Sequence, residues 1–176
     1  SAASDVYKRQ GLDKVYLMPT YLPPHVDEKK TISSEHRLAM LELAVADNPC
    51  LDIEPIELIR KGKSYTYDTM KALKEANPDT DYYFIIGGDM VEYLPKWHRI
   101  DDLLHLVQFV GIRRPNYPTE STYPIIWVDV PQMAISSTLI RQKVKSGCST
   151  RYLLPENVIN YIQEKGLYQD ELDNKL

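Results

Sequence analysis

Short apolar segments typical of β-strands alternate with amphipathic segments typical of helices along most of this chain. The strand-like segments cover residues 14–18, 51–58, 81–87, 106–112 and 125–130, and the helix-like segments cover 34–47, 67–76, 100–106, 139–146 and 155–166. A strand followed by a crossover helix and another strand pairs in parallel, and such sheets carry helices on both faces. We therefore predict an α/β fold with a Rossmann-like, doubly wound, mostly parallel sheet.

Individual residues refine these boundaries. The segment 81–87 is the strongest strand, because it is aromatic and β-branched and ends at two glycines. Pro55 lacks a backbone donor, so it predicts an edge position for the strand over 51–58. Pro155 suits the first position of the final helix, and Gly166 suits its end.

Polar and glycine-rich segments follow four of the predicted strands directly. They are Pro19–His25, Gly87–Asp89, Arg113–Pro115 and Ser136–Arg141. In doubly wound sheets, ligands bind beyond the carboxyl ends of the strands. We therefore predict that these segments gather into one binding site.

The segment Ser136–Arg141 has the composition of a phosphate site. A helix start offers unpaired N–H groups and the positive end of the helix dipole, so it holds anions. Ser137 and Thr138 can cap the helix or donate to phosphate oxygens, and Arg141 adds a planar, permanently charged fork. The alternative is an ordinary capped helix with a surface arginine.

Gly87, Gly88 and Asp89 suit a nucleotide contact. Glycines permit close approach of a ligand to the main chain, and a carboxylate can accept hydrogen bonds from ribose hydroxyls. Asp89 is not expected to touch phosphate, since two anions repel. A tight turn with Asp89 as a helix cap stays an alternative. Arg113 or Arg114 could hold a triphosphate, or both could be surface charges.

Charge and cysteine content narrow the function further. The net charge of −4 gives no general attraction to nucleic acid. Cys50 and Cys148 are isolated, so neither a zinc site nor a disulfide framework is indicated, which suits a reducing cytosol. We find no apolar run of membrane length and no secretory signal. We expect a cytoplasmic protein with neither nucleic-acid nor membrane partners; association into homo-oligomers is left open.

Several segments together resemble a known family. The order Ile135-Ser-Ser-Thr-Leu-Ile-Arg141 resembles the C-terminal signature of the nucleotidyltransferase superfamily. The other matches, which are similar to the bacterial nicotinate-nucleotide adenylyltransferases within it, are Met18–His25, His36–Met40, Ser64–Met70, Phe84–Asp89 with Trp97, and Tyr152–Pro155 through Gly166–Tyr168. The resemblance extends from about residue 11 to residue 168.

The resemblance implies adenylyl transfer from ATP to nicotinate mononucleotide, giving deamido-NAD and pyrophosphate in NAD biosynthesis. Mg²⁺ would accompany ATP, bound mainly by phosphates and water rather than by a protein cage, so no protein metal site is expected. The family's Arg-Pro pair points to Arg114 for the triphosphate, and the resemblance makes Asp89 and Gly88 nucleotide contacts. Together with Ser137, Thr138 and Arg141 they form the expected ATP site, with Arg141 as the candidate catalytic group.

Tyr65, Thr66 and Trp97 are implied to bind nicotinate mononucleotide. The family's tryptophan lies against the nicotinate ring, and stacking of an electron-poor ring on indole is physically sensible. Backbone N–H groups near Tyr65 and the Thr66 hydroxyl would recognise the carboxylate. From the residues alone, Trp97 could equally be a half-buried packing residue. The segment Ser64–Thr66 could likewise be a helix cap.

Five other basic positions are weaker candidates. Arg37 reads by default as a solvated side chain, although a role near the mononucleotide stays open. His25 and His36 lack metal-like partners, so we expect satisfied loop or surface histidines. Relatives commonly have Lys where Val26 follows Pro-Pro-His; Lys29 or Lys30 could compensate.

The N-terminal residues depart from the family. Residues 1–10 resemble a non-native scar, or else a native tail, and give way at Gly11 to family-like sequence. The superfamily's Gly-x-Phe-x-Pro-x-His-x-x-His loop, with its strand, is not found. We therefore expect an N-terminally truncated member that lacks the first, central strand and the charge stabilisation that the histidines supply. A single domain is expected over residues 11–170, followed by a tail over 171–176.

Two alternative functions stay open. One is a related small-molecule adenylyltransferase, for example one that prefers the nicotinamide mononucleotide. The other is a non-catalytic nucleotide-binding fragment, for which the absent histidine loop is the argument. A purely structural protein fits least well, because the polar motifs gather at one edge of the predicted sheet.

Overall fold

The computed structural model describes residues 14–21, 32–114, 120–130, 136–151 and 153–169. The chain divides into two compact units, one over residues 1–15 and 64–132 and the other over residues 16–63 and 133–176. Residues 1–10, 171–176, His25, Val26, Lys29, Lys30 and Pro115 lie outside the described residues. The single domain over 11–170 stays a prediction.

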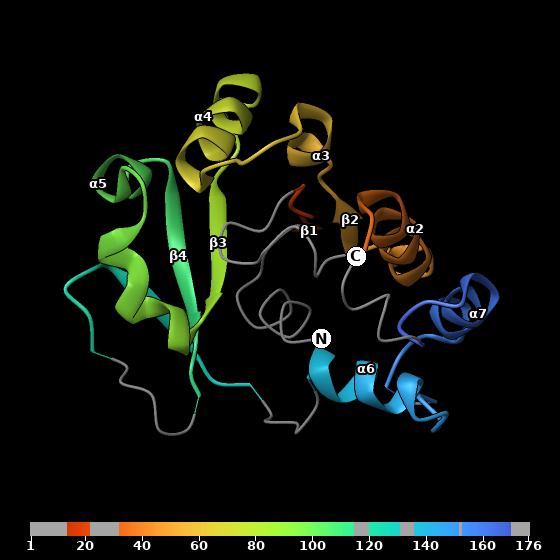
Figure 1. Cartoon of the computed structure of the whole chain (residues 1–176). Helices are drawn as coiled ribbons and strands as arrows, with labels where there is room; N and C mark the ends of the chain where they lie inside the picture. The colour runs from red at the N-terminus through yellow and green to blue at the C-terminus, as the bar shows by residue number, and fades with distance from the viewer. Residues whose placement is uncertain (1–13, 22–31, 115–119, 131–135, 152, 170–176) are drawn as a thin grey trace. The chain divides into compact units, whose positions relative to one another are not determined.

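The first unit is built on a three-stranded parallel sheet. Its elements are α4 (Thr66–Ala76), β3 (Tyr82–Gly87), the 3₁₀-helix η2 (Gly88–Lys96), α5 (Ile100–Leu103), β4 (Val107–Ile112) and β5 (Ile125–Val128). The strand order is β3-β4-β5, and Figure 1 shows β3 and β4 side by side. Phe84 pairs with Phe109 and Val110 with Ile126. The predicted α/β fold with parallel strands is confirmed.

The core of this unit lies on one face of the sheet. Phe109, Leu94 and Leu103 are completely buried there, one each from β4, η2 and α5. On the other face Val110 packs with Val128. Because β4 has buried residues on both faces, it has the character expected of an inner strand in a parallel sheet.

The second unit combines a strand pair with four helices. Its elements are β1 (Val15–Leu17, of which Val15 is assigned to the first unit), α2 (Ser34–Val45), β2 (Leu51–Ile53), α3 (Ile56–Arg60), α6 (Ser137–Lys145) and α7 (Glu156–Lys165). Strands β1 and β2 pair with each other, and within the described residues they form a sheet separate from β3-β4-β5. Figure 1 shows α2 and α7 next to each other.

Helices α2 and α7 are joined by apolar and polar contacts. Val158 and Ile162 of α7 are buried and pack against residues of α2 that include Met40. A hydrogen bond of 2.9 Å joins His36 Nδ1 and Tyr161 Oη. His36 is therefore satisfied by a neighbouring side chain, as the sequence predicted.

Two predicted elements are shorter in the structure. The strand over 51–58 ends at Ile53, and Pro55 caps helix α3, because its fixed φ and missing N–H suit a helix start as well as a sheet edge. The helix over 100–106 ends at Leu103. The bonds His105 N to Asp102 O and Leu106 N to Leu103 O then tighten the turn into β4.

Helix η2 was not predicted. Its sequence begins at Gly88 and contains Pro95, two residues that usually mark loops. Val91 and Leu94 are nevertheless buried against β3, β4 and α5. Tertiary burial therefore stabilises a helix where local propensity predicts a loop.

Candidate functional site

The carboxyl ends of the parallel strands bring charged residues together in the first unit. Asp89 follows β3, and Arg114 follows β4. Arg114 Nε lies 3.7 Å from Asp89 Oδ1. Beside them, Arg113 Nη1 lies 3.0 Å from Asp129 Oδ2, after β5. The predicted convergence of Asp89 and Arg114 at one sheet edge is observed, and their ligand roles remain proposals.

Gly87 and Gly88 are required by this arrangement. A methyl group at Gly87 would lie 2.6 Å from Asp89 Oδ1, and one at Gly88 would lie 2.9 Å from the carbonyl oxygen of Ile112. The protein's own groups thus make the close approach that we had assigned to a ligand. Asp89 does not cap η2, whose N-cap is Gly87 without a side-chain bond, so the cap alternative is wrong.

The ion pair between Asp89 and Arg114 is only weakly stabilising. Both side chains are partly exposed, and exposed pairs contribute about 0–1 kcal/mol. Arg114 can therefore exchange this partner for a phosphate at little cost, and Asp89 can exchange it for a hydroxyl.

The residues implied for the mononucleotide surround an aromatic cluster in the same unit. Tyr65 is the N-cap residue of α4, so the segment Ser64–Thr66 lies at a helix start as the cap reading expected, although no side-chain cap bond is formed. Tyr65 stacks on His98 with ring centroids 4.4 Å apart. Thr66 begins α4, where backbone N–H groups lack partners within the helix. His98 was missed, because a lone histidine between Trp and Arg gives no signal in the sequence.

Trp97 lies half-buried at the end of η2. Its indole makes edge contacts with Phe84 and Phe109, with ring centroids 5.9 Å and 5.8 Å away. The packing role that we considered from sequence alone is therefore present. A role of Trp97 in binding the nicotinate ring remains a proposal.

Helix α6 begins as the phosphate motif predicts. The hydroxyl of Ser136 accepts a hydrogen bond of 3.1 Å from Leu139 N and so caps the helix. Ser137 and Thr138 follow in the exposed first turn, two residues earlier than the predicted helix start. Arg141 Nη2 donates to Thr138 Oγ1 over 3.4 Å. Capping thus uses Ser136 and leaves the hydroxyls of Ser137 and Thr138 in the exposed turn beside Arg141.

A cavity of about 550 Å³ in the second unit borders this helix start. Its wall is largely apolar, with Met40, Ile140 and Ile162 among its residues. Its polar groups come from Thr20, Arg37, Ser137, Arg141 and Tyr168. Burial raises the pKa of the Tyr168 phenol, and Arg141 and Arg37 act in the opposite direction. The cavity therefore carries positive charge near the phosphate motif.

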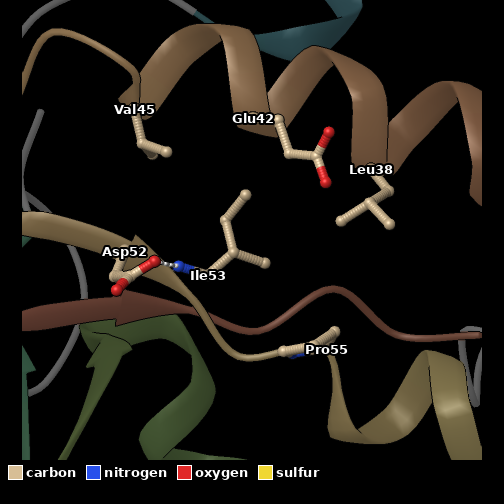
Figure 2. Close-up of a pocket in the computed structure, with 6 residues that line it drawn as sticks. All are labelled: Leu38, Glu42, Val45, Asp52, Ile53 and Pro55. Atoms are coloured by element: carbon tan, nitrogen blue, oxygen red, sulfur yellow. Dashed lines mark hydrogen bonds between the residues drawn. The ribbon is translucent and has the colours of Figure 1, made fainter.

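A second cavity of about 340 Å³ lies between α2 and β2. Figure 2 shows Leu38, Glu42 and Val45 of α2 facing this cavity, with Asp52 and Ile53 of β2 on its other side. Its charged lining residues are Glu42 and Asp52, both acidic. Such a wall repels phosphate, so the cavity that borders α6 is the better candidate for a nucleotide.

Arg37 differs most from its prediction. We expected a solvated arginine, but its side chain is half-buried and donates to the carbonyl oxygens of Thr20, Tyr21 and Ile32. A surface arginine and an arginine that holds main-chain carbonyls look alike in sequence, because the acceptors are brought to it only by folding.

Comparison with known proteins adds independent findings. The cytidylyltransferase-like family matches residues 2–143. The chain is 97% identical over 174 residues to the probable nicotinate-nucleotide adenylyltransferase of Enterococcus faecalis, covering 99% of this chain and 80% of that protein. It is 59% identical over 167 residues to the protein of the same name from Streptococcus mutans, covering 95% of this chain and 80% of that protein.

Solved structures show the same fold. The Plasmodium falciparum nicotinic acid mononucleotide adenylyltransferase complexed with NaAD superposes with a TM-score of 0.77, covering 97% of this chain and 90% of that chain at 16% identity. The same enzyme complexed with APC gives a TM-score of 0.74, covering 97% and 89% at 16% identity.

Proposed function

Since this chain belongs to the nicotinate-nucleotide adenylyltransferases of the cytidylyltransferase-like family, we propose that it transfers the adenylyl group of ATP to nicotinate mononucleotide. The products are deamido-NAD and pyrophosphate. The observation that carries this proposal is the 97% identity over 99% of the chain to the Enterococcus faecalis protein. The hydrogen bond between Arg141 and Thr138 in the first turn of a helix that begins at Ser137 supports it.

The reaction is a substitution at the α-phosphorus of ATP, in which one P–O bond forms and another breaks. An oxygen of the mononucleotide phosphate attacks the α-phosphorus of ATP, and the bond from that phosphorus to the bridging oxygen of pyrophosphate breaks. No covalent enzyme intermediate is needed, so positioning and positive charge supply the catalysis.

Each proposed site residue then has a defined task. Ser137 and Thr138 donate to the ATP phosphates, and Arg141 stabilises the charge that develops on the leaving pyrophosphate. Arg114 binds the triphosphate, and Asp89 accepts hydrogen bonds from a ribose, with Gly88 beside it.

The mononucleotide has its own group of residues. Trp97 stacks on the nicotinate ring, and the start of α4 at Tyr65 and Thr66 donates to its carboxylate. A helix start favours an anion, so the start of α4 should stabilise the carboxylate of nicotinate mononucleotide and not the uncharged carboxamide of nicotinamide mononucleotide.

Mg²⁺ is proposed to enter with ATP. Among the described residues, no group of three or more His, Cys, Asp or Glu side chains gathers to hold a metal. The ion, when bound to ATP, neutralises phosphate charge, and phosphates and water supply most of its ligands. Within the described part of the chain, no helix is both long and apolar enough to span a membrane. We propose a cytoplasmic location.

Pyrophosphate release from ATP and nicotinate mononucleotide tests the function. We expect release with the acid and much less with nicotinamide mononucleotide at equal concentration. Replacing Arg141→Gln is expected to lower kcat/KM about 100-fold, as for other groups that stabilise developing charge. Lys145→Gln removes one charge from the far end of the same helix and serves as the matched control. A folded chain that releases no pyrophosphate with either mononucleotide would contradict the proposal.

A further inference from the structure

One guanidinium holds the main chain at three carbonyl oxygens in the second unit. Arg37 Nη1 donates to Thr20 O over 2.5 Å, and Nη2 donates to Tyr21 O over 3.0 Å. Nε donates to Ile32 O over 3.3 Å. The planar fork of arginine presents its N–H groups in fixed directions, so it can hold several acceptors in one geometry.

These acceptors lie on both sides of residues 22–31. Thr20 and Tyr21 follow strand β1, whereas Ile32 directly precedes Ser33, the N-cap of α2. Ser33 in turn accepts a hydrogen bond of 3.3 Å from His36 N. A single side chain on the first turn of α2 therefore ties the main chain after β1 to the start of this helix.

The tied main chain forms part of the cavity next to the phosphate motif. Thr20 and Arg37 line this cavity together with Ser137 and Arg141. Tyr168 lines it as well and interacts electrostatically with both arginines. Burial lowers the pKa of Arg37, and the interaction with Tyr168 raises the same pKa. A guanidinium nevertheless stays charged at neutral pH.

We propose that Arg37 is a positioning residue for the ATP side of the reaction. It acts through the main chain of Thr20, which lines the cavity together with Ser137 and Arg141, and through that of the neighbouring Tyr21. Its N–H groups point at carbonyl oxygens, so it shapes the phosphate site without being a phosphate ligand itself. The inference rests on the proposed function, because it assigns Ser137 and Arg141 to ATP.

Steady-state kinetics of two variants test this role. Arg37→Gln keeps a polar side chain but loses the fork, and we expect the KM for ATP to rise and kcat/KM for ATP to fall about 10- to 100-fold, as for a positioning error near 1 Å. The KM for nicotinate mononucleotide should stay within about twofold, since its proposed ligands lie in the other unit. Arg37→Lys keeps the positive charge but lacks the planar fork, so its KM and kcat/KM for ATP should not return to the wild-type values.

The matched control is Arg60→Gln, which removes the same charge from an exposed side chain of α3 in the same unit. Thermal denaturation confirms that each variant is folded, and Arg37→Lys carries the test if Arg37→Gln does not fold. An unchanged KM for ATP would overturn the inference. So would an equal loss for both substrates, which indicates general destabilisation, or full rescue by lysine, which indicates charge alone.

Calorimetric titration with ATP separates this inference from the proposed function. If the wild-type chain binds ATP but releases no pyrophosphate, the enzyme proposal fails, and a lower affinity in Arg37→Gln still supports the positioning role. Equal ATP affinity in both chains would overturn it. If the wild-type chain binds no ATP, both proposals fail together.

Discussion

Gly87 shows how one position without a side chain sets the geometry of two charged neighbours. The space beside it is filled by the carboxylate of Asp89 and the guanidinium of Arg114. Both groups reach this space because β3 and β4 run in parallel and end at the same edge. At this scale, the glycines and charged residues after β3 and β4 predict a binding site in the sequence. They do not predict which atoms occupy the space beside Gly87.

Replacing Gly87→Ala should reduce activity more than stability. The added methyl would lie 2.6 Å from Asp89 Oδ1, so this carboxylate must move, whereas Arg114 Nε at 3.5 Å is in ordinary contact. We expect kcat/KM to fall about 10-fold or more from this displacement. Pyrophosphate release measures the loss.

Gly147→Ala is the control for this prediction. No heavy atom lies within 4 Å of an added methyl there, but φ is +73°. The left-handed conformation makes alanine cost about 1–2 kcal/mol, so stability falls while kcat/KM stays unchanged. If both variants lost activity equally, the crowding at Gly87 would not be the cause.

At the scale of the element, the start of α6 has one observed role, which is to cap the helix, and one proposed role, which is to bind phosphate. The cap is made by Ser136, which leaves Ser137 and Thr138 in the exposed first turn beside Arg141. These two tasks impose different chemical demands on one residue. Stability needs an acceptor at the cap, whereas phosphate binding needs the absence of negative charge.

Two substitutions of Ser136 should separate these tasks. Ser136→Ala removes the cap and should lower the free energy of unfolding by about 1 kcal/mol. Ser136→Asp caps as well as serine, so stability is kept, but its charge should weaken ATP binding on the order of tenfold. Urea denaturation and calorimetry measure the two effects, and Ser136→Thr should preserve both. Equal ATP affinity in the Asp variant would place the phosphates elsewhere.

Elements with a strong local signal were predicted well. The strand over 81–87 and helix α4 are found nearly at their predicted bounds, because the hydrophobic pattern and the flanking turn residues indicate the same boundaries there. Helix η2 was missed because burial of Leu94 overrides Gly88 and Pro95. The hydrogen bonds from Arg37 to main-chain carbonyls could not be predicted from the sequence either, since residues 20 and 37 meet only after folding.

At the scale of the whole molecule, the sequence predicted the α/β class and the parallel strands, and the division into two units came from the structure. The nicotinate residues and the pair Asp89–Arg114 lie in one unit, whereas Ser137, Thr138 and Arg141 lie in the other. Composition and periodicity carry no information on such a division, because each unit follows the same α/β pattern.

Global stability should depend on Tyr168 at alkaline pH. Burial raises the pKa of this phenol above its ordinary value of 10.0, so the folded chain holds the proton more tightly than the unfolded chain. The resulting stability is present in full below pH 10 and is lost as pH rises through the folded pKa. Tyr168→Phe has no proton to lose and should escape this loss.

Urea denaturation of both chains between pH 8 and pH 11 measures this effect. The difference in unfolding free energy between wild type and Tyr168→Phe should be constant up to about pH 10 and then shift in favour of the variant. Other tyrosines and lysines titrate in both chains, so they cancel in the difference. A difference that stayed flat across this range would contradict the assignment.

Gly111 and Trp127, on neighbouring strands β4 and β5, share one further constraint. A methyl group at Gly111 would lie 2.8 Å from Trp127 Cζ3, and the same indole carbon lies 3.5 Å from the corresponding point at Gly88. The large ring thus occupies the volume that two small residues leave empty. In evolutionary terms Gly111 and Trp127 are epistatic: β4 can gain a side chain at Gly111 only after the indole of β5 has been replaced by a smaller group, so the order of substitutions is constrained by geometry.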